Sequence, residues 1–248
     1  MTRHQISRVR RETRRRTLAV ASVERLTPRM QRVHFTSDDL RDFDSGAPDD
    51  HIKLFLPTPE GPQSRDYTPR AFDAARGRLT VDFALHEAGP ATAWALAAKA
   101  GDRLEIGGPR GSNIVADDFD WYLLIGDETA LPAIGRRLEE LRPGVPVTTV
   151  VAIDDDGERQ TPVTRAAWTP VWAVRKPAMT DDAALILDAL AGHEPPPGDG
   201  YVWIAAEGRV ARALRVHFVE ALGHPREWIK AAGYWSRGQV AVHETFKD

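Results

Sequence analysis

The chain of 248 residues predicts two fold types in succession, a small antiparallel β barrel and then an α/β half with a parallel sheet. Short apolar runs with turn residues between them fill residues 17–119, whereas apolar runs alternate with helical stretches from residue 120 onward. The length also suits one large domain or two of ordinary size. We therefore expect a basic leader at 1–16, a six-stranded barrel at 17–119 and an α/β domain at 120–248.

Four short runs that are apolar or alternate with polar residues carry the barrel prediction. These expected strands are Leu18–Val23, Met30–Phe35, His51–Leu56 and Leu79–Leu85. One helix is expected in this half, from Thr92 to Ala100, because the stretch is rich in alanine and Gly101 follows it.

In the second half, Trp121–Ile125 is continuously apolar, as a strand buried on both faces would be. Helical stretches alternate with further apolar runs, which is typical of a parallel sheet with helices on its faces. The expected strands that follow are Val145–Ile153, Tyr201–Ala206 and a run near Trp228–Ile229. The expected helices are Ala130–Leu141, Asp181–Ala191 and Val210–Leu222.

Composition restricts the chemistry that the chain performs alone. It contains no cysteine, which excludes disulfides, thiol catalysis and an iron–sulfur cluster on cysteine ligands. One-electron chemistry would therefore need a bound cofactor, and we assign no metal ligand. No apolar run reaches the roughly 18 residues of a membrane span, and Leu18–Ala21 is too short for a secretory signal. We expect a soluble, cytoplasmic protein.

The charge of the chain is uneven. The formal net charge is −3, yet residues 1–16 hold seven arginines and one glutamate, so the remainder is acidic. A basic cluster is compatible with binding to nucleic acid or to an anionic membrane. No aromatic residue is interleaved with it, and basic termini are common. We therefore favour a solvated, partly disordered leader and expect neither partner.

The first motif is Arg65-Asp66-Tyr67-Thr68-Pro69-Arg70. In an extended segment, Arg65 and Tyr67 lie on the same face, so a guanidinium that binds phosphate stands beside a ring that covers a flat heterocycle. Thr68 adds a hydroxyl for a ring nitrogen. The alternative interpretation is a strand edge whose charges are solvated.

Two glycine-containing segments follow. In the segment from His86 to Thr92, Gly89 permits close approach of a ligand and the next residue, a proline, opens a helix. The free N–H groups at Ala91 and Thr92 would then form an anion site, unless this is only a well-capped helix. The segment Ile106–Ser112 is also glycine-rich and by itself indicates a turn.

The fourth motif, Gly126-Asp127-Glu128-Thr129, follows the expected strand Trp121–Ile125 and opens a helix. This is the carboxyl end of a parallel strand, where α/β sheets bind nucleotides. The motif is neither a G-x-G-x-x-G fingerprint nor a P-loop. Its two acids would repel a diphosphate, so we expect Thr129 and the backbone to make the contacts. Alternatively, the acids only complement the helix dipole.

These four segments, in this order and spacing, resemble the siderophore-interacting protein family, which belongs to the ferredoxin-reductase-like flavoenzymes. The resemblance extends from about Thr17 to Gly238. Further short matches are Asp50–Leu54, Trp172–Arg175, Tyr201–Glu207 and Gly233–Gly238. The chain departs from the family at Ala206, where a glycine usually precedes the glutamate, and at Ser236, where many members have a basic residue.

The resemblance implies an FAD-binding barrel, a nicotinamide-binding α/β domain and an NAD(P)H-dependent ferric-siderophore reductase. It implies that Arg65, Tyr67 and Thr68 hold the flavin and that the turn from Gly89 to Thr92 takes the FAD phosphates. The cofactor-binding residues that we expect are Arg65, Tyr67, Thr68, Asp82, His86, Gly89, Ala91, Thr92, Gly126, Asp127, Thr129 and Glu207.

Electron counting agrees with this function. A nicotinamide delivers two electrons as hydride, ferric iron accepts one at a time, and a flavin links the two. Hard oxygen ligands favour Fe(III), so reduction to Fe(II) frees the metal, and no acid–base catalytic residue is needed. The donor is NADH or NADPH. Asp154, Asp155 and Asp156 favour NADH, because a carboxylate there would repel a 2′-phosphate, although Arg159 is close enough to reverse this.

The acceptor needs a local basic patch, because many ferric siderophores are anionic and the body of the chain is acidic. The candidates near the flavin edge and the aromatic pair Tyr234-Trp235 are His51, Lys53, Lys230 and Arg237. Ordinary solvated lysines are the alternative at Lys53 and Lys230. Two other functions stay open, a flavin reductase with a protein or quinone acceptor and a non-enzymatic flavin- or siderophore-binding module. We expect a monomer.

Overall fold

The structure is a computed structural model that describes residues 3–86, 89–176, 181–237 and 244–245. Glu87, Ala88 and Gly238 of the sequence motifs lie outside these residues. The chain divides into two compact units, Ile6–Val115 and a second unit made of Met1–Gln5 with Ala116–Asp248. None of the helices described is long and apolar enough to cross a membrane. The predicted domain boundaries at residues 16, 119 and 120 stay a prediction.

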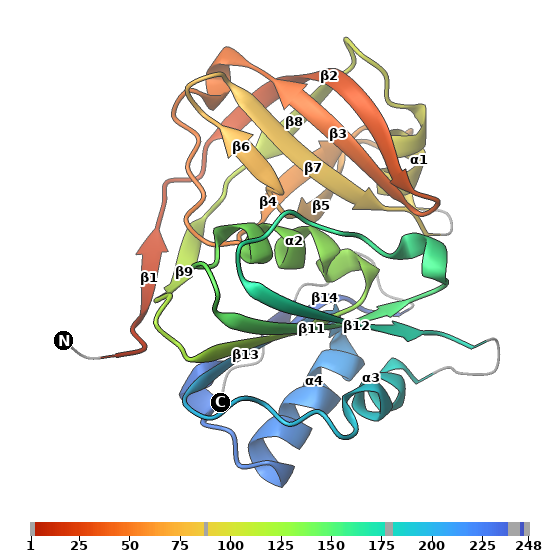
Figure 1. Ribbon diagram of the computed structural model, residues 1–248. Coiled ribbons are helices and arrows are strands. Elements are labelled where there is room, and N and C mark those ends of the chain that lie inside the picture. Colours follow the sequence, from red (N-terminus) through yellow and green to blue (C-terminus); the bar gives the residue numbers. More distant parts are fainter. Residues whose placement is uncertain (1–2, 87–88, 177–180, 238–243, 246–248) are drawn as a thin grey trace. The chain divides into compact units, whose positions relative to one another are not determined.

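The unit Ile6–Val115 is built on a curved antiparallel sheet of seven strands in the order β5-β4-β8-β2-β3-β7-β6 (Figure 1). These strands are β2 (Arg15–Thr27), β3 (Met30–Thr36), β4 (Ile52–Leu56), β5 (Gln63–Tyr67), β6 (Ala71–Asp73), β7 (Arg78–Ala84) and β8 (Arg103–Gly107). The predicted fold class is confirmed. The sheet contains one strand more than the six expected, and its shortest strand, β6, pairs with β7 at the sheet edge.

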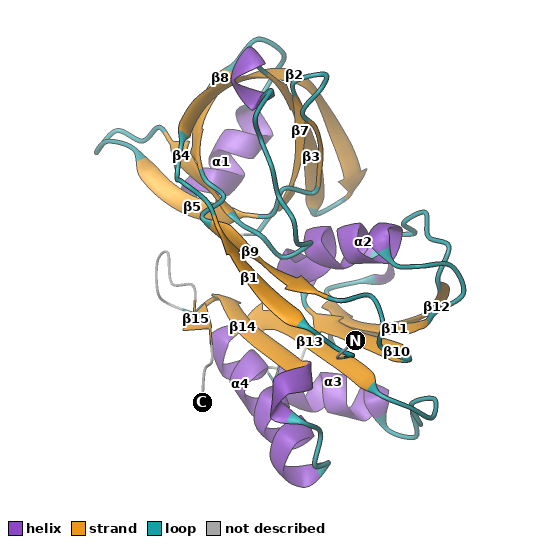
Figure 2. Ribbon diagram, turned by 90° about the vertical axis from the view of Figure 1, so that its left-hand side faces the viewer, coloured by secondary structure: helices purple, strands orange, loops and turns teal. Residues whose placement is uncertain are grey.

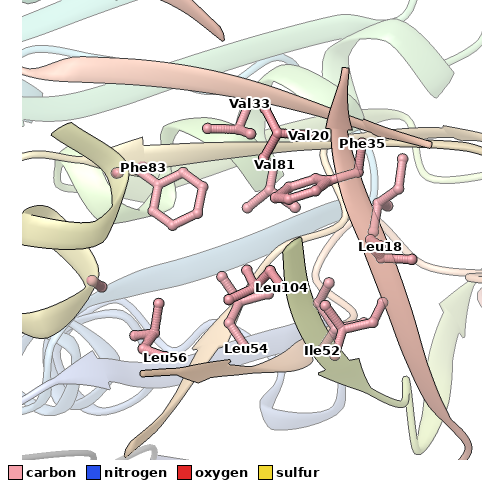
Figure 3. Packing of buried hydrophobic residues seen from close by; sticks show 14 of the residues in the cluster. Leu18, Val20, Val33, Phe35, Ile52, Leu54, Leu56, Val81, Phe83 and Leu104 are labelled. Carbon is pink, nitrogen blue, oxygen red and sulfur yellow. The ribbon is translucent and has the colours of Figure 1, made fainter. Parts of the chain in front are cut away.

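Alternation along the strands builds the core of this unit. In β4, Ile52, Leu54 and Leu56 are fully buried, whereas the residues between them are only partly covered. Figure 3 shows these side chains meeting apolar side chains of β2, β3 and β7 across the interior. Helix α1 (Pro90–Ala97) adds Ala91 and Ala95 to the same core.

Helix α1 begins two residues earlier than predicted and ends three residues earlier. Proline suits the first helical position, because its φ is preset and its missing N–H is not needed there. At the other end Ala98 is extended, and the Lys99 N–H donates to Asp102 Oδ2 at 3.0 Å, so residues 98–101 form a turn rather than a last helical turn.

The basic start of the chain is a strand, so the expectation of a partly disordered leader is wrong for residues 6–10. Strand β1 (Ile6–Arg10) pairs with β9 (Gly111–Val115) as a separate two-stranded sheet (Figure 2). All five residues of β1 are exposed, as expected of a solvated segment. Its partner lies about a hundred residues away and its exposed side chains have no apolar period, so local patterning does not predict it.

The second unit contains a sheet in the order β12-β11-β10-β13-β14-β15, parallel except for β15 (Glu244–Thr245). The parallel strands are β10 (Trp121–Gly126), β11 (Pro146–Ile153), β12 (Ala167–Val174), β13 (Gly200–Glu207) and β14 (Ile229–Trp235). Every residue of β10 and β13 is buried, which explains their continuous apolar sequences.

Helices cover both faces of this sheet, as strand–helix alternation predicts (Figures 1 and 2). Helix α2 (Leu131–Glu140) lies on one face, and α3 (Asp182–Leu190) and α4 (Gly208–Val216) lie on the other. The predicted helix Val210–Leu222 is α4 followed by a π-helical turn, His217–Ala221.

Candidate functional site

The parallel sheet reverses its strand order between β10 and β13. The chain goes from β10 to β11 and β12 on one side, whereas β13 and β14 lie on the other side. In open α/β sheets, ligands bind outside the carboxyl ends of the strands at such a point. Gly126 ends β10 and Glu207 ends β13, so two of the expected cofactor residues belong to this edge.

Packing explains the glycine at position 126. A Cβ on Gly126 would lie 2.4 Å from the Ala130 Cβ and 2.6 Å from the Ala205 carbonyl oxygen. A side chain here would therefore displace the following turn or the neighbouring strand. The predicted approach of a ligand to Gly126 stays a prediction.

The Asp127 carboxylate, 1% exposed, accepts four hydrogen bonds from the protein. Its Oδ1 accepts from the Thr129 N–H at 2.9 Å and from the Thr129 hydroxyl at 2.5 Å. Its Oδ2 accepts from the Glu207 N–H at 3.0 Å and from the Trp235 indole N–H at 2.9 Å. Burial raises the pKa of Asp127, while these bonds act in the opposite direction. Cofactor contacts by Asp127 and Thr129 stay predictions.

The Glu207 carboxylate is the N-cap of helix α4 and is also mostly buried. Its Oε2 accepts from the N–H groups of Arg209 at 2.7 Å and Val210 at 3.3 Å, which are donors that a helix start leaves free. Its Oε1 accepts from the Arg237 N–H at 3.2 Å. The structure thus joins Glu207 to the backbone of an acceptor candidate, and its predicted cofactor contact stays untested.

A cluster around Arg175 was missed by the sequence reasoning. Arg175 follows β12, and its Nε and Nη2 atoms donate to the two oxygens of Asp182 at 2.9 and 2.8 Å. Its Nη1 contacts Asp154 at 2.9 Å, and the guanidinium also binds Glu128. Burial alone would lower the pKa of Arg175, but bonds to the carboxylates raise it above its ordinary value. The available signal was an arginine directly after a strand at the edge that carries Glu128 and Asp154.

In the other unit, Arg65 and Tyr67 lie on one face of β5, as predicted. Opposite them on β4 are Leu54 and Ile52, both fully buried. The Tyr67 ring packs on Phe83 with ring centroids 4.6 Å apart, and burial raises the pKa of its phenol. This leaves the Arg65–Tyr67 face directed to the interior side of the sheet.

The partners of Arg65 are neutral. Its Nη1 donates to the Ser64 carbonyl at 2.9 Å and its Nη2 to the Gln63 side-chain oxygen at 3.0 Å. Within the described residues no carboxylate forms an ion pair with it. Thr68, which follows, is buried. A cationic group with only neutral partners suits an anionic ligand.

Asp82 and His86 differ in environment. Asp82 is 3% exposed and accepts two hydrogen bonds from Arg32, at 2.7 and 2.8 Å, with Arg70 at 3.8 Å. Its charge is therefore balanced within the protein. His86 is exposed. A cofactor contact by either residue stays a prediction.

The start of helix α1 meets the requirements of an anion site. Gly89 is its N-cap and supplies no side-chain cap, and a Cβ there would meet only His86 Cε1, at 4.0 Å. The Thr92 hydroxyl is buried without a hydrogen-bond partner among the described residues. A buried hydroxyl in that state costs free energy. The residues present therefore fit an FAD phosphate, which would supply the missing acceptor.

The acceptor candidates fall in both units. His51 and Lys53 belong to the barrel unit, where Lys53 Nζ lies 2.9 Å from Asp66 Oδ1 and the lysine side chain is 35% exposed. Lys230 and Arg237 belong to the α/β unit, with Lys230 half-buried and Arg237 exposed. The gathering of these four residues into one patch stays a prediction.

Comparison with known families agrees with both halves. The family model described as siderophore-interacting FAD-binding domain matches residues 19–64 and 60–113, and the model described as siderophore-interacting protein matches residues 119–238. The chain is 34% identical to the NADPH-dependent ferric-chelate reductase of Escherichia coli K12, over 92% of this chain and 95% of that protein. It is 30% identical to the ferric vibriobactin reductase ViuB of Vibrio cholerae, over 86% and 87%.

A solved structure shares the whole fold. The siderophore utilization protein from T. fusca superposes with a TM-score of 0.89 at 34% identity, covering 96% of this chain and 98% of that one. The similarity includes both the barrel and the α/β half. This chain belongs to the siderophore-interacting protein family.

Proposed function

We propose that this protein is an FAD-dependent reductase that passes electrons from NAD(P)H to the iron of a ferric siderophore. The observation that carries the proposal is the Thr92 hydroxyl at a helix start, which is buried and has no hydrogen-bond partner among the described residues. It lies in a domain that matches the siderophore-interacting FAD-binding family. The relatives named as ferric-chelate and ferric vibriobactin reductases support the same reaction.

FAD, when bound, supplies the conversion of a two-electron donor into successive one-electron transfers. The residues of this chain bind and orient it. Arg65 offers a charge to a phosphate, the α1 start offers N–H groups and the Thr92 hydroxyl, and Tyr67 offers a ring. One NAD(P)H reduces two ferric ions to ferrous ions and releases one proton, so electrons balance without an acid–base residue.

We propose NADH as the better donor, although the related E. coli protein is named as NADPH-dependent. Glu128, Asp154 and Asp182 surround the single Arg175 guanidinium, which leaves this cluster with an excess of negative charge. A 2′-phosphate beside it would be repelled, whereas a ribose hydroxyl would not.

We further propose a cytoplasmic, monomeric protein, because that compartment holds the reduced nicotinamide that the reaction consumes.

The test of the function is the absorbance of the purified protein. FAD bands should be present, NADH should bleach them under anaerobic conditions faster than NADPH, and a ferric catecholate should restore them with formation of ferrous iron. Retention of the oxidised spectrum with both nicotinamides would indicate a binding module. Bleaching without reoxidation by ferric chelates would indicate a protein or quinone acceptor.

The basic patch is tested by charge. Lys53→Ala and Arg237→Ala should each raise the half-saturating concentration of an anionic ferric chelate several-fold and leave a neutral chelate unaffected, because only the former is attracted. The loss should shrink at high salt. Arg76→Ala is the control, since Arg76 is mostly exposed and pairs with Asp73, three residues before it. Equal kinetics of the double variant and the wild type at low salt would place the acceptor elsewhere.

A further inference from the structure

We propose that Asp127 and Glu207 are positioning residues that together fix the segment Trp235–Arg237 at the acceptor side of the site. The inference rests on the proposed function and deepens it, because these two acids were expected to bind cofactor. Their bonds also link the carboxyl ends of β10, β13 and β14 to one another.

The first observation is a β-bulge at the end of β14. Ala206 of β13 lies opposite Gly233, but the next residue, Glu207, lies opposite Trp235. Tyr234 is therefore the extra residue, and its ring packs edge-on against Trp203 with centroids 6.2 Å apart. Bulges re-aim side chains next to active sites. This one directs Trp235 toward the loop that carries Asp127.

The second observation is that the two acids bond the two ends of the segment Trp235–Arg237. Asp127 Oδ2 accepts from the Trp235 indole at 2.9 Å, and Glu207 Oε1 accepts from the Arg237 N–H at 3.2 Å. The two acids are themselves joined, because Asp127 Oδ2 also accepts from the Glu207 N–H at 3.0 Å. One hydrogen-bond network therefore joins Trp235 and Arg237 to the carboxyl ends of β10 and β13, which come much earlier in the chain.

The third observation is that the Trp235 indole donates its hydrogen bond to the Asp127 carboxylate. An indole has one polar group, a donor, so an acceptor in its plane decides which way the ring lies. Among the described residues, every group that hydrogen-bonds to Asp127 is a donor, and Thr129 supplies the two donors on Oδ1. An ionised, buried carboxylate satisfies all four. Asp127 is therefore suited to orienting Trp235 and has no capacity left over for a further strong bond.

Arg237 shows why this orientation matters for the acceptor. Its backbone N–H donates to Glu207 while its side chain is exposed, two residues after the half-buried Trp235. A cation and an aromatic ring in one fixed segment suit an anionic chelate with aromatic rings, such as a ferric catecholate. We therefore assign the network the task of presenting Trp235 and Arg237 to that class of acceptor.

The experiment compares Asp127→Asn with the control Asp181→Asn in the FAD-loaded, full-length protein. Asp181 likewise caps a helix, α3, through bonds to the Ala183 and Ala184 N–H groups at 3.0 and 3.3 Å, and has no link to residues 235–237. The first measurement is the ¹⁵N–¹H signal of the Trp235 indole, assigned with Trp235→Phe. The second is the rate at which ferric tricatecholate reoxidises the reduced flavin, in single turnover.

Asp127→Asn should shift the indole signal upfield and raise the half-saturating chelate concentration about three- to tenfold, with flavin occupancy matching that of Asp181→Asn. In the Trp235→Phe background, Asp127→Asn should add no further loss, because the two residues act as one unit. Trp235→Phe alone should reproduce the kinetic change, which keeps the test available if Asp127→Asn does not fold.

Three results would overturn the proposal. They are an unchanged indole signal in Asp127→Asn, chelate kinetics equal to those of Asp181→Asn, and additive losses in the double variant. Failure of the proposed function is distinguishable, since the wild-type flavin would then not be reoxidised by the chelate although the indole signal still reports the network.

Discussion

Two expected ligand-binding residues of the barrel unit, Arg65 and Thr92, lack the partners that a bound anion would supply, whereas Asp127 and Glu207 of the α/β unit are fully hydrogen-bonded by the protein. In the barrel, Arg65 has neutral partners and the buried Thr92 hydroxyl has none among the described residues. In the α/β unit, Asp127 and Glu207 accept bonds from the protein on both of their oxygens. We therefore propose that the unsatisfied groups hold the tightly bound cofactor and that the satisfied groups form a scaffold for a transient ligand.

The largest expected effect is a loss of stability in the α/β unit when the Arg175 side chain is removed. Arg175→Ala should lower the free energy of unfolding by about 3 kcal/mol, because three mostly buried carboxylates lose their common partner. Urea denaturation of the flavin-free protein measures it. Arg159→Ala is the matched control and should cost less than about 1 kcal/mol, since its pair with Asp156 is exposed. Equal losses in the two variants would show that the Arg175 cluster contributes little to stability.

The second effect should fall on flavin binding and spare stability. Arg65→Ala should weaken FAD binding roughly tenfold to a hundredfold, because a charge-assisted bond to a phosphate contributes about 1.5–3 kcal/mol. Titration of the flavin-free protein with FAD, followed by flavin fluorescence, gives the affinity. Arg76→Ala, which removes an exposed arginine paired with Asp73, is the control. Full flavin occupancy in Arg65→Ala would sink the assignment of this residue.

Substitution of Thr92 should change the stability of the flavin-free protein and its affinity for FAD in opposite directions. Thr92→Val should stabilise the flavin-free protein by about 1 kcal/mol, because it removes a buried hydroxyl that lacks a partner, yet it should weaken FAD binding by a similar amount. Thr80→Val is the control, because the Thr80 hydroxyl lies 3.0 Å from His34 Nδ1. It should lose stability and keep FAD affinity. A loss of stability in Thr92→Val would mean that the hydroxyl has a structural role in the flavin-free protein.

The fold was predictable where a local pattern decides it. Alternation in β4 and the continuous apolar run of β10 identify the two sheet types, and Gly89 with the following proline identifies the start of α1. Strand β1 was not predictable, because its pairing with β9 joins an exposed segment to a partly buried one about a hundred residues away. Long-range pairing of this kind leaves no periodic signal in either segment.

The residue types of the site at the strand ends were predictable from the sequence. The hydrogen bonds and ion pairs that these residues make with one another were not. The Asp127–Trp235 bond spans 108 residues, and the bulge that aims Trp235 arises only when β13 and β14 pair. The same holds for Arg175, which gathers acids from three separate segments. Tertiary contacts therefore decide which carboxylates lack a protein partner and can bind a ligand. The spacing of the residues along the sequence does not predict these contacts.

The smallest expected effect tests whether the satisfied α/β unit tolerates a new charge. His224 is half-buried, with its Nε2 3.4 Å from the Trp228 carbonyl and its ring 6.1 Å from that of Trp121. Burial lowers the pKa of His224 below its ordinary value of 6.5, and hydrogen bonding to the backbone only partly offsets this. Below pH 6.5 the unfolded chain therefore binds a proton at this position more readily than the folded protein does.

Stability contributed by neutral His224 should accordingly be fully present above pH 6.5 and be lost as the pH falls toward the lowered folded-state pKa. Replacing the ring by an amide removes this linkage, so the stability difference between His224→Gln and the wild type should be constant from pH 7.5 to 8.5. It should then change in favour of the variant between pH 6.5 and 5, by less than about 1.4 kcal/mol for each pH unit. Urea midpoints at these pH values measure the difference. A stability difference that stays constant down to pH 5 would mean that protonated His224 is as stable in the folded unit as in water. The pKa of His224 would then not be lowered by burial, and the α/β unit would accept a buried positive charge at this position.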